Sequence, residues 1–412
     1  MNYIDLFAGA GGLSEGFKRA GFIPLAHVEM DKAACYTLKT RISYYYLQET
    51  KQLDIYYQYL KGEINREDFY NEIPPKLLDS VINKSIGGKN NRLIFDVIDR
   101  LKGDIPVDII IGGPPCQAYS TVGRGALKHK KIDPRKRLYL EYGKFLIKYN
   151  PKIFVFENVP GLKTSDGGLH FNRIKRYFRY LGYRIDVRSL NSWDFGVIQK
   201  RERLIIIGSK VSAELEIPQF EKISNTNTSE LLFNDLPPLQ AGMGGKWCRY
   251  YSESNSYLNE FNIRNGIDFT TLHIARPHNV QDLKIYAMAI DKLQDGKRLK
   301  NSDIPDEDRT QKNVVDFLDR FKVVDLIPHT MIAHIAKDGH HFIHPDINQL
   351  RSISVREAAR IQSFPDNFYF EGESENKNRT AAFKQIGNAV PPIMAEKIAK
   401  QILDFFNGSN YR

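Results

Sequence analysis

Residues 1–29 constrain the fold more than any other part of the chain, because they combine two apolar strand patterns with a glycine loop. The pattern predicts a strand, a helix and a second strand, at Asn2–Leu6, Leu13–Ala20 and Phe22–Val28. The loop Phe7–Gly12 precedes the helix, and Gly21 is placed to end it. Glu29 ends the second strand, about 20 residues after Gly9. This order is typical of a nucleotide-binding α/β sheet, in which such an acid binds ribose hydroxyls.

A later junction between strand and turn holds a cysteine. The apolar run Val107–Ile111 leads into Gly-Gly-Pro-Pro-Cys-Gln-Ala-Tyr-Ser at residues 112–120. Two consecutive prolines restrict φ and remove two backbone donors, so this stiff turn presents Cys116 at the carboxyl end of a strand. Ligands bind at that edge of an open α/β sheet, and we therefore expect Cys116 to take part in the chemistry.

The alternation of strands and helices continues beyond this turn and then fades. Further strands are predicted at Leu93–Val97, Lys152–Glu157, Tyr183–Leu190 and Leu204–Gly208, the last two as a hairpin. Helices are predicted over residues 133–150, at Asn172–Leu181 and Val355–Ile361, and within Ala381–Phe406. We therefore predict an α/β sheet with helices on both faces and a smaller irregular domain. The expected boundaries are 1–210 for the sheet domain, 211–350 for the irregular domain, and 351–412 for a segment that returns to complete the first.

Residues 41–92 lie between the second and third predicted strands. They are rich in tyrosine and charge, with helical spacing and a break at Pro74–Pro75. We interpret them as a mostly helical excursion on the surface, and their pattern does not indicate a function.

Composition favours an ordinary globular protein. Hydrophobic residues make up 42% of the 412 positions and charged residues 26%. No apolar run reaches the length of a membrane span, and the N-terminus lacks the pattern of a signal peptide. Cys35, Cys116 and Cys248 are too far apart in sequence to suggest a disulfide framework or a zinc motif. These features predict a reduced, cytoplasmic protein.

The positive charge is concentrated beside the cysteine. The chain has a formal net charge of +10, and residues 124–137 hold seven lysines and arginines against one acid, Asp133. A solvated basic loop would explain this run. We favour a loop that contacts phosphates, because it begins eight residues after Cys116.

Six ordered blocks carry a more specific signal. They are Asp5–Gly12, Gly113–Gln117, Glu157–Val159, Gln199–Arg203, Arg356–Pro365 and Gln385–Val390. Their content and order closely resemble those of the cytosine-5 DNA methyltransferase family. The resemblance covers residues 1–35, about 93–210 and about 351–400, and it implies a Rossmann-like sheet that binds S-adenosylmethionine.

The resemblance also implies a catalytic set. Cys116 matches the nucleophile, whose thiolate adds to carbon 6 of cytosine so that carbon 5 can attack a methyl group. Glu157 matches the acid that protonates ring nitrogen 3, which requires a raised pKa. Arg203 matches the arginine that reaches the exocyclic oxygen, and Arg201 the one that supports the site near the sulfur. Taken alone, these residues could equally be a core thiol, a satisfied carboxylate and surface arginines.

The implied cofactor is S-adenosylmethionine, with S-adenosylhomocysteine as product. Glu29 would bind its ribose, and Met30 stands where the family often has a larger side chain that stacks on adenine. Asp96 is our choice for the adenine amino group. The full expected set is Phe7, Ala8, Gly9, Gly11, Gly12, Leu13, Glu29, Met30, Asp96, Pro114, Asn388 and Val390.

The implied partner is double-stranded DNA, from which the target cytosine is flipped. The basic loop 121–137 would close over that base, and residues 211–350 would read sequence in the major groove. Expected DNA contacts are Gln117, Ser120, Arg124, Lys128, Lys130, Lys131 and Arg135. Five histidines lie between His329 and His344, but without the spacing of a zinc module, and we expect no metal.

Together these features predict a monomeric bacterial enzyme of a restriction–modification system, in which a cognate restriction endonuclease is a further expected partner. Three alternatives stay open: the related branch that methylates tRNA, a non-catalytic DNA-binding relative, and an NAD-dependent oxidoreductase. A recognition region of about 140 residues favours DNA, intact catalytic blocks favour an enzyme, and no acid–base set for nicotinamide chemistry is found.

Overall fold

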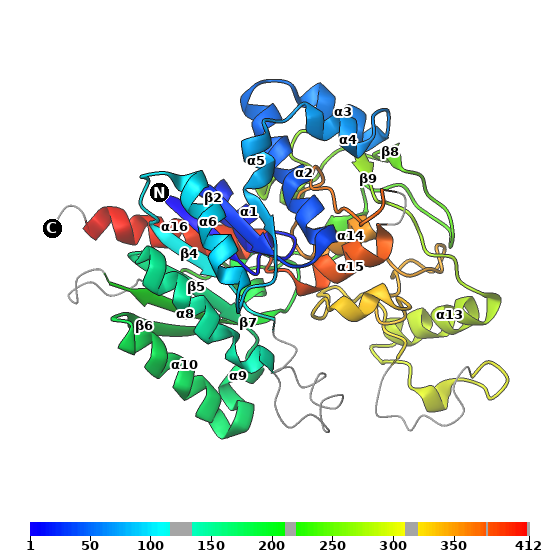
Figure 1. Ribbon diagram of the computed structural model, residues 1–412. Helices are drawn as coiled ribbons and strands as arrows, with labels where there is room; N and C mark the ends of the chain where they lie inside the picture. Colours follow the sequence, from blue (N-terminus) through cyan, green and yellow to red (C-terminus); the bar gives the residue numbers. More distant parts are fainter. Residues whose placement is uncertain (116–133, 211–219, 310–319, 376–377, 410–412) are drawn as a thin grey trace.

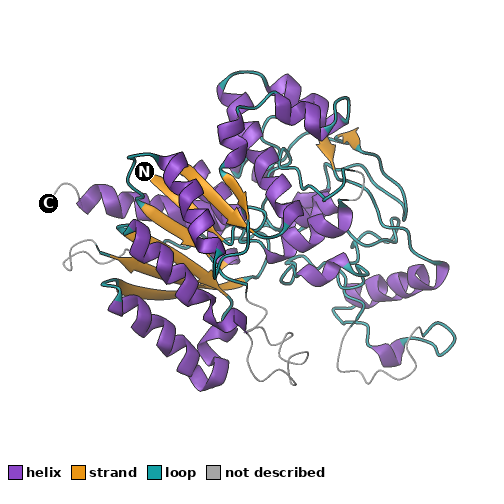
Figure 2. Ribbon diagram, in the orientation of Figure 1, coloured by secondary structure: helices purple, strands orange, loops and turns teal. Residues whose placement is uncertain are grey.

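The computed structural model describes residues 1–115, 134–210, 220–309, 320–375 and 378–409 (Figure 1). Within them, the central feature is a seven-stranded sheet in the order β3-β2-β1-β4-β5-β7-β6 (Figure 2). In that order the strands are Val81–Asn83, Ile23–Glu29, Asn2–Leu6, Ile109–Gly112, Ile153–Asn158, Glu202–Ser209 and Arg184–Asn191. Neighbours from β3 to β5 are parallel, whereas β7 is antiparallel to both β5 and β6. The predicted pairing of the last two strands is confirmed.

Helices cover both faces of this sheet, as predicted. Side chains of a strand alternate between faces, so Ile4 and Ile110 pack in one core while Tyr3 and Ile109 pack in another. The first core is closed by α6, α8 and α10, and the second by α1 and α16 (Figure 1). These helices span Asn90–Lys102, Leu138–Tyr149, Leu169–Tyr180, Gly12–Arg19 and Pro392–Ser409.

The last helix packs closely against the first. A Cβ atom at Gly16 would lie 2.4 Å from the Cβ atom of Ala395, so only glycine permits this approach of α1 and α16. Arg19 strengthens the contact through an ion pair, with 2.9 Å between its Nε and the Oε2 of Glu396. The two ends of the described chain therefore build one layer of the sheet domain.

The tyrosine-rich stretch is mostly helical, as predicted, but it is an integral part of the fold, so the expected position as a surface excursion is wrong. It holds part of α2 and all of α3, α4, α5 and β3, the helices spanning Lys32–Glu49, Leu53–Lys61, Arg66–Asn71 and Pro75–Asp79. Tyr56 and Tyr59 are buried, and their hydroxyls donate to the carbonyl of Asn367 at 2.7 Å and to Oε1 of Glu371 at 2.5 Å. A tyrosine ring buries well when its hydroxyl finds such a partner.

The predicted strand Leu93–Val97 is also wrong. These residues belong to α6, where Ile94 and Ile98 are buried one helical turn apart. The third strand is instead β3, whose three residues are too few to show an alternating pattern.

The rest of the chain is irregular between β7 and α14. Its short elements are α11 (Glu230–Phe233), β8 (Trp247–Arg249), α12 (Ser256–Glu260), β9 (Phe269–Thr271), α13 (Val280–Gln294) and the 3-10 helices η5 (Asn301–Asp303) and η6 (Ala333–Ala336). Helices α14 (Val355–Ile361) and α15 (Arg379–Asn388) follow, and α14 has the predicted bounds. Within the described ranges, no helix combines the length and apolar character that a membrane crossing requires.

Candidate active site

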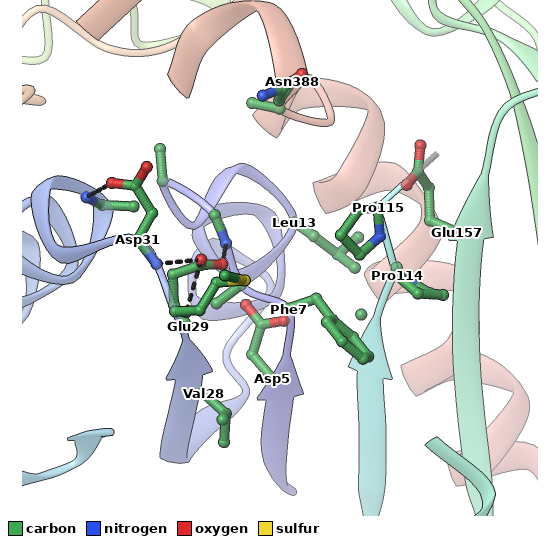
Figure 3. Close-up of a pocket in the computed structure, with 18 of the residues that line it drawn as sticks. Asp5, Phe7, Leu13, Val28, Glu29, Asp31, Pro114, Pro115, Glu157 and Asn388 are labelled. Atoms are coloured by element: carbon green, nitrogen blue, oxygen red, sulfur yellow. Dashed lines mark hydrogen bonds between the residues drawn. The ribbon is translucent and has the colours of Figure 1, made fainter. Parts of the chain in front are cut away.

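A cavity of about 540 Å³ opens at the carboxyl ends of the central strands (Figure 3). Its walls come from the loops after β1, β2, β3, β4 and β5, and from the end of α15. This is the edge at which open α/β sheets bind ligands. Of the expected cofactor residues, those in the cavity lining are Phe7, Ala8, Gly9, Gly12, Leu13, Glu29, Met30, Pro114, Asn388 and Val390.

Two glycines of the first loop have separate structural roles. Gly11 adopts φ +83° as the residue before α1, a conformation that favours glycine, and it is not part of the cavity lining. At Gly12 a Cβ atom would lie 2.3 Å from the carbonyl oxygen of Val390. Gly12 therefore lets the segment after α15 close directly onto the loop, which forms one wall of the cavity.

Glu29 holds the loop from the opposite side. Its Oε2 accepts from the backbone N–H of Gly9 at 2.8 Å, and its Oε1 accepts from those of Met30 and Asp31 at 2.7 Å each (Figure 3). Burial raises the pKa of Glu29, and these three hydrogen bonds oppose the rise. A carboxylate has about four acceptor positions, so roughly one is left for a ligand.

The sequence analysis missed a buried acid in this cavity. Asp5 is 1% exposed and lines the cavity, and its Oδ2 has no hydrogen-bond partner among the described residues. Burial raises the pKa of Asp5 well above its usual value, and the nearby charge of Glu29 adds to the rise. The available sequence signal was an acid near the end of an apolar strand, within the motif Asp5–Gly12.

Asp96 does not reach the cavity. It lies on the exposed side of α6, within the segment for which the sequence pattern predicts a strand. The loop after the true third strand, Lys84–Ile86, lines the cavity instead. The adenine contact assigned to Asp96 is therefore withdrawn.

The candidate catalytic wall of the cavity is built by β5 and β7, which pair side by side. Glu157 and Arg203 both line the cavity, and Nε of Arg203 lies 2.7 Å from Oε1 of Glu157. Burial raises the pKa of Glu157, while the charges of Arg203 and Arg201 oppose the rise. A Cβ atom at Gly113 would lie 2.6 Å from Oε2 of Glu157, so the turn before the cysteine passes directly over this acid.

Asn158 holds the same turn through a hydrogen bond. This residue is 1% exposed, and its Nδ2 donates to the carbonyl of Pro114 at 3.2 Å. Its Oδ1 accepts from the backbone N–H of Val159 at 2.9 Å. Asn158 therefore ties the strand that carries Glu157 to the turn that leads to Cys116, a role the sequence analysis did not assign.

Arg201 is completely buried and is not part of the cavity lining. Its Nη2 donates to the carbonyls of Gly387 and Ala389 at 2.9 Å each, and its Nη1 donates to the carbonyl of Met331. It therefore joins three distant segments beside the site, rather than reaching into the cavity itself.

Most of the expected DNA contacts lie outside the described residues. These are Gln117, Ser120, Arg124, Lys128, Lys130 and Lys131, and the expected nucleophile Cys116 lies outside them too. Arg135, in the 3-10 helix η2 (Pro134–Arg137), lines the cavity. Described residues on both sides of the stretch 116–133 therefore line the cavity.

Two of the five histidines between 329 and 344, His334 and His341, contact each other at 5.5 Å between ring centres, and others have separate partners. His329 stacks on Phe342 at 4.5 Å between ring centres, and His340 bonds to the hydroxyl of Tyr286 at 2.8 Å. Within the part of the chain that the structure describes, no three histidine, cysteine or acidic side chains gather as they would around a metal ion.

Known proteins resemble this chain over nearly its whole length. The sequence profile of the C-5 cytosine-specific DNA methylase family matches residues 1–73 and 82–404. The type II methyltransferase M.Bpa9945I of Bacillus paralicheniformis is 40% identical and is matched over 99% of this chain and 100% of its own length. M.DdeI, a type II methyltransferase of Desulfomicrobium norvegicum, is 31% identical over 100% of this chain and 90% of its own.

Solved structures agree on the fold. A prophage-encoded protein of E. coli superposes with a TM-score of 0.64 at 23% identity, over 99% of each chain. The Entamoeba histolytica methyltransferase EhMeth superposes with a TM-score of 0.55 at 16% identity, over 98% of each chain. With the cavity, the catalytic wall and these relatives in view, the chain belongs to the C-5 cytosine-specific DNA methylase family.

Proposed function

We propose that this DNA cytosine-5 methyltransferase, an enzyme of the type II restriction–modification kind, acts through a covalent adduct between Cys116 and a flipped cytosine. The observation that carries the proposal is one cavity whose two ends are lined by chemically different residues. One end holds the glycine loop and Glu29, and the other holds Glu157 and Arg203 beside the turn that leads to Cys116.

S-adenosylmethionine fits the first end of the cavity and, when bound, supplies an electrophilic methyl group carried by a positively charged sulfur. The volume of about 540 Å³ lies within the usual range for small-molecule sites. Glycine at position 12 leaves room between the loop and Val390, and Glu29 keeps an acceptor position for a ribose hydroxyl. The buried, unpartnered Oδ2 of Asp5 suits a cationic ligand, whose charge would lower the raised pKa of that acid.

The second end of the cavity suits the pyrimidine. Addition of the Cys116 thiolate to carbon 6 places negative charge on the ring, and a proton held by Glu157 stabilises it at nitrogen 3. Burial favours the protonated form of Glu157. Arg203 pairs with Glu157 and offers further N–H groups to the exocyclic oxygen. After methyl transfer to carbon 5, loss of the carbon-5 proton to water expels the thiolate, and return of the nitrogen-3 proton to Glu157 restores the aromatic base.

Duplex DNA is the substrate we assign. The net charge of +10 suits a polyanion, and the family profile and the type II relatives concern DNA. We further propose that residues 211–350 form the domain that recognises the target sequence. A nuclease with the same target would complete the restriction–modification system.

Trapping and sequencing test this proposal together. Duplex DNA that contains 5-fluorocytosine should form a stable covalent complex with the wild-type protein in the presence of S-adenosylmethionine, and Cys116→Ala should form none while still binding DNA. Bisulfite sequencing of DNA from cells that express the protein should show 5-methylcytosine in one short motif. Methylation of tRNA in preference to duplex DNA, or equal loss of DNA binding and turnover in Cys116→Ala, would contradict the proposal.

A further inference from the structure

One segment of the irregular region is hydrogen-bonded to the block Gln199–Arg203. The segment 328–337 runs beside residues 199–201, where Oε1 of Gln199 accepts from the backbone N–H of Met331 at 2.7 Å. The hydroxyl of Thr330 donates to the carbonyl of Lys200 at 2.7 Å. Arg201 donates to the carbonyl of Met331, so the segment is bonded through both main chain and side chains.

The same segment packs against the end of α15. A Cβ atom at Gly387 would lie 2.3 Å from the backbone nitrogen of Ala333, so the two backbones are in direct contact. The residue that follows, Asn388, lines the cavity. The charge of Arg201 also acts on Glu157 in the catalytic wall. Because Arg201 bonds to Met331 as well, a single side chain connects the segment to that wall.

The segment has a buried side and an exposed side. Met331 and Ile335 are 0% and 1% exposed and belong to the main core, which fixes the backbone between them. Ile332 is 37% exposed on this fixed backbone. Lys200, whose carbonyl accepts from Thr330, and Lys337, at the end of the same segment, are also exposed. A rigid apolar side chain with cations nearby suits base pairs and their phosphates.

We propose that Ile332 is a DNA-contacting residue that packs against the base pairs next to the target cytosine, and that residues 328–337 are the part of the recognition region nearest to the flipped base. The inference rests on the proposed function, since it needs duplex DNA in the site. A flipped base leaves a gap in the stack, and an apolar side chain can fill it without reading hydrogen bonds. Lys200 and Lys337 would hold the adjoining phosphates.

The test compares Ile332→Ala with a control variant, Ile105→Ala. Ile105 is 51% exposed in the loop that leads into the start of β4, at the edge of the sheet opposite the cavity and outside the proposed recognition domain. The substrates are duplexes that carry a motif methylated by the wild type, with the target cytosine either paired with guanine or mispaired with adenine. Methyl transfer, S-adenosylmethionine affinity and unfolding midpoint are measured for each protein.

On the paired duplex, Ile332→Ala should lower kcat/KM for DNA on the order of tenfold, while Ile105→Ala changes little. On the mispaired duplex the defect should shrink, because flipping a mispaired base costs less. Ile332→Leu should keep most of the activity. Equal defects on both duplexes, equal defects in the two alanine variants, or a lowered S-adenosylmethionine affinity in Ile332→Ala would overturn the inference. Failure of the wild type itself to methylate any duplex would instead refute the proposed function.

Discussion

The contact between Gly12 and Val390 gives the sharpest test of how the cofactor end of the cavity is built. In Gly12→Ala the new Cβ would stand 2.3 Å from the carbonyl oxygen of Val390 and 3.2 Å from the ring of Phe364. Real Cβ atoms essentially never approach another atom within 3.0 Å, so the loop or the segment after α15 must move by at least about 0.7 Å. Forced overpacking of this kind costs about 1–3 kcal/mol.

A control variant separates this clash from the general effect of replacing glycine. Gly→Ala reduces the entropy of the unfolded chain and stabilises by about 0.4–1 kcal/mol where the backbone permits it. At Gly245 the nearest atom to an added Cβ is 3.5 Å away and φ is not in the left-handed region, so Gly245→Ala should be neutral or slightly stabilising. The two variants therefore differ by the overlap at Gly12 and by its position in the cavity.

Urea unfolding and calorimetric binding of S-adenosylmethionine give the two readouts. Gly12→Ala should unfold at a lower urea concentration than Gly245→Ala and should bind the cofactor at least about tenfold more weakly, because a displaced loop no longer matches the ligand. If Gly12→Ala matched Gly245→Ala in both stability and affinity, the direct closure of the C-terminal segment onto the loop would be refuted.

Three further outcomes follow from individual charged or titratable side chains. Arg360→Leu should destabilise the fold by about 3–5 kcal/mol in urea unfolding, because Asp235 and Asp366 would lose the charge that both now contact; wild-type stability would contradict this. Burial lowers the pKa of His27 from 6.5 to about 4, so only the unfolded chain takes up this proton between those values, and stability should fall as the pH drops from 6.5 to 4. His27→Gln should flatten that dependence in unfolding curves recorded across this range, and an unchanged slope would exclude His27 as a cause. Glu29→Ala should weaken S-adenosylmethionine binding by about 1–3 kcal/mol in calorimetry, since three backbone N–H groups lose their acceptor, and unaltered binding would remove Glu29 from the site.

Sequence patterns predicted local structure well where a period or a cap is written into adjacent residues. The bounds of β1 and α14 agree with the expectation, because the apolar residues Tyr3, Ile4 and Leu6 mark the strand and Ser354 with Glu357 forms a capping box at the helix start. The same reasoning failed at residues 93–97. There the apolar spacing of Ile94 and Ile98 already had helical period, and the true third strand was too short to be seen.

The residues of the candidate site were likewise predicted only in part from the sequence. Motif order alone pointed to the glycine loop, Glu29, Glu157 and Arg203, all of which except Gly11 line the cavity. It misplaced Asp96, which lies in a helix where the sequence pattern predicts a strand. It also missed the support that Asn158 gives to the turn before Cys116, since the partner carbonyl of Pro114 lies 44 positions away.

By itself, the sequence determined the family, the alternation of strands, loops and helices in the sheet domain, and the residue types that carry the chemistry. These depend on neighbouring residues, whose backbone angles and side-chain alternation are set locally. Only the tertiary structure decided which distant segments meet, such as Arg201 with Met331 and Gly387, or α1 with α16. Such contacts depend on how whole elements pack against each other, and close packing is a property of three-dimensional neighbours that no local pattern records.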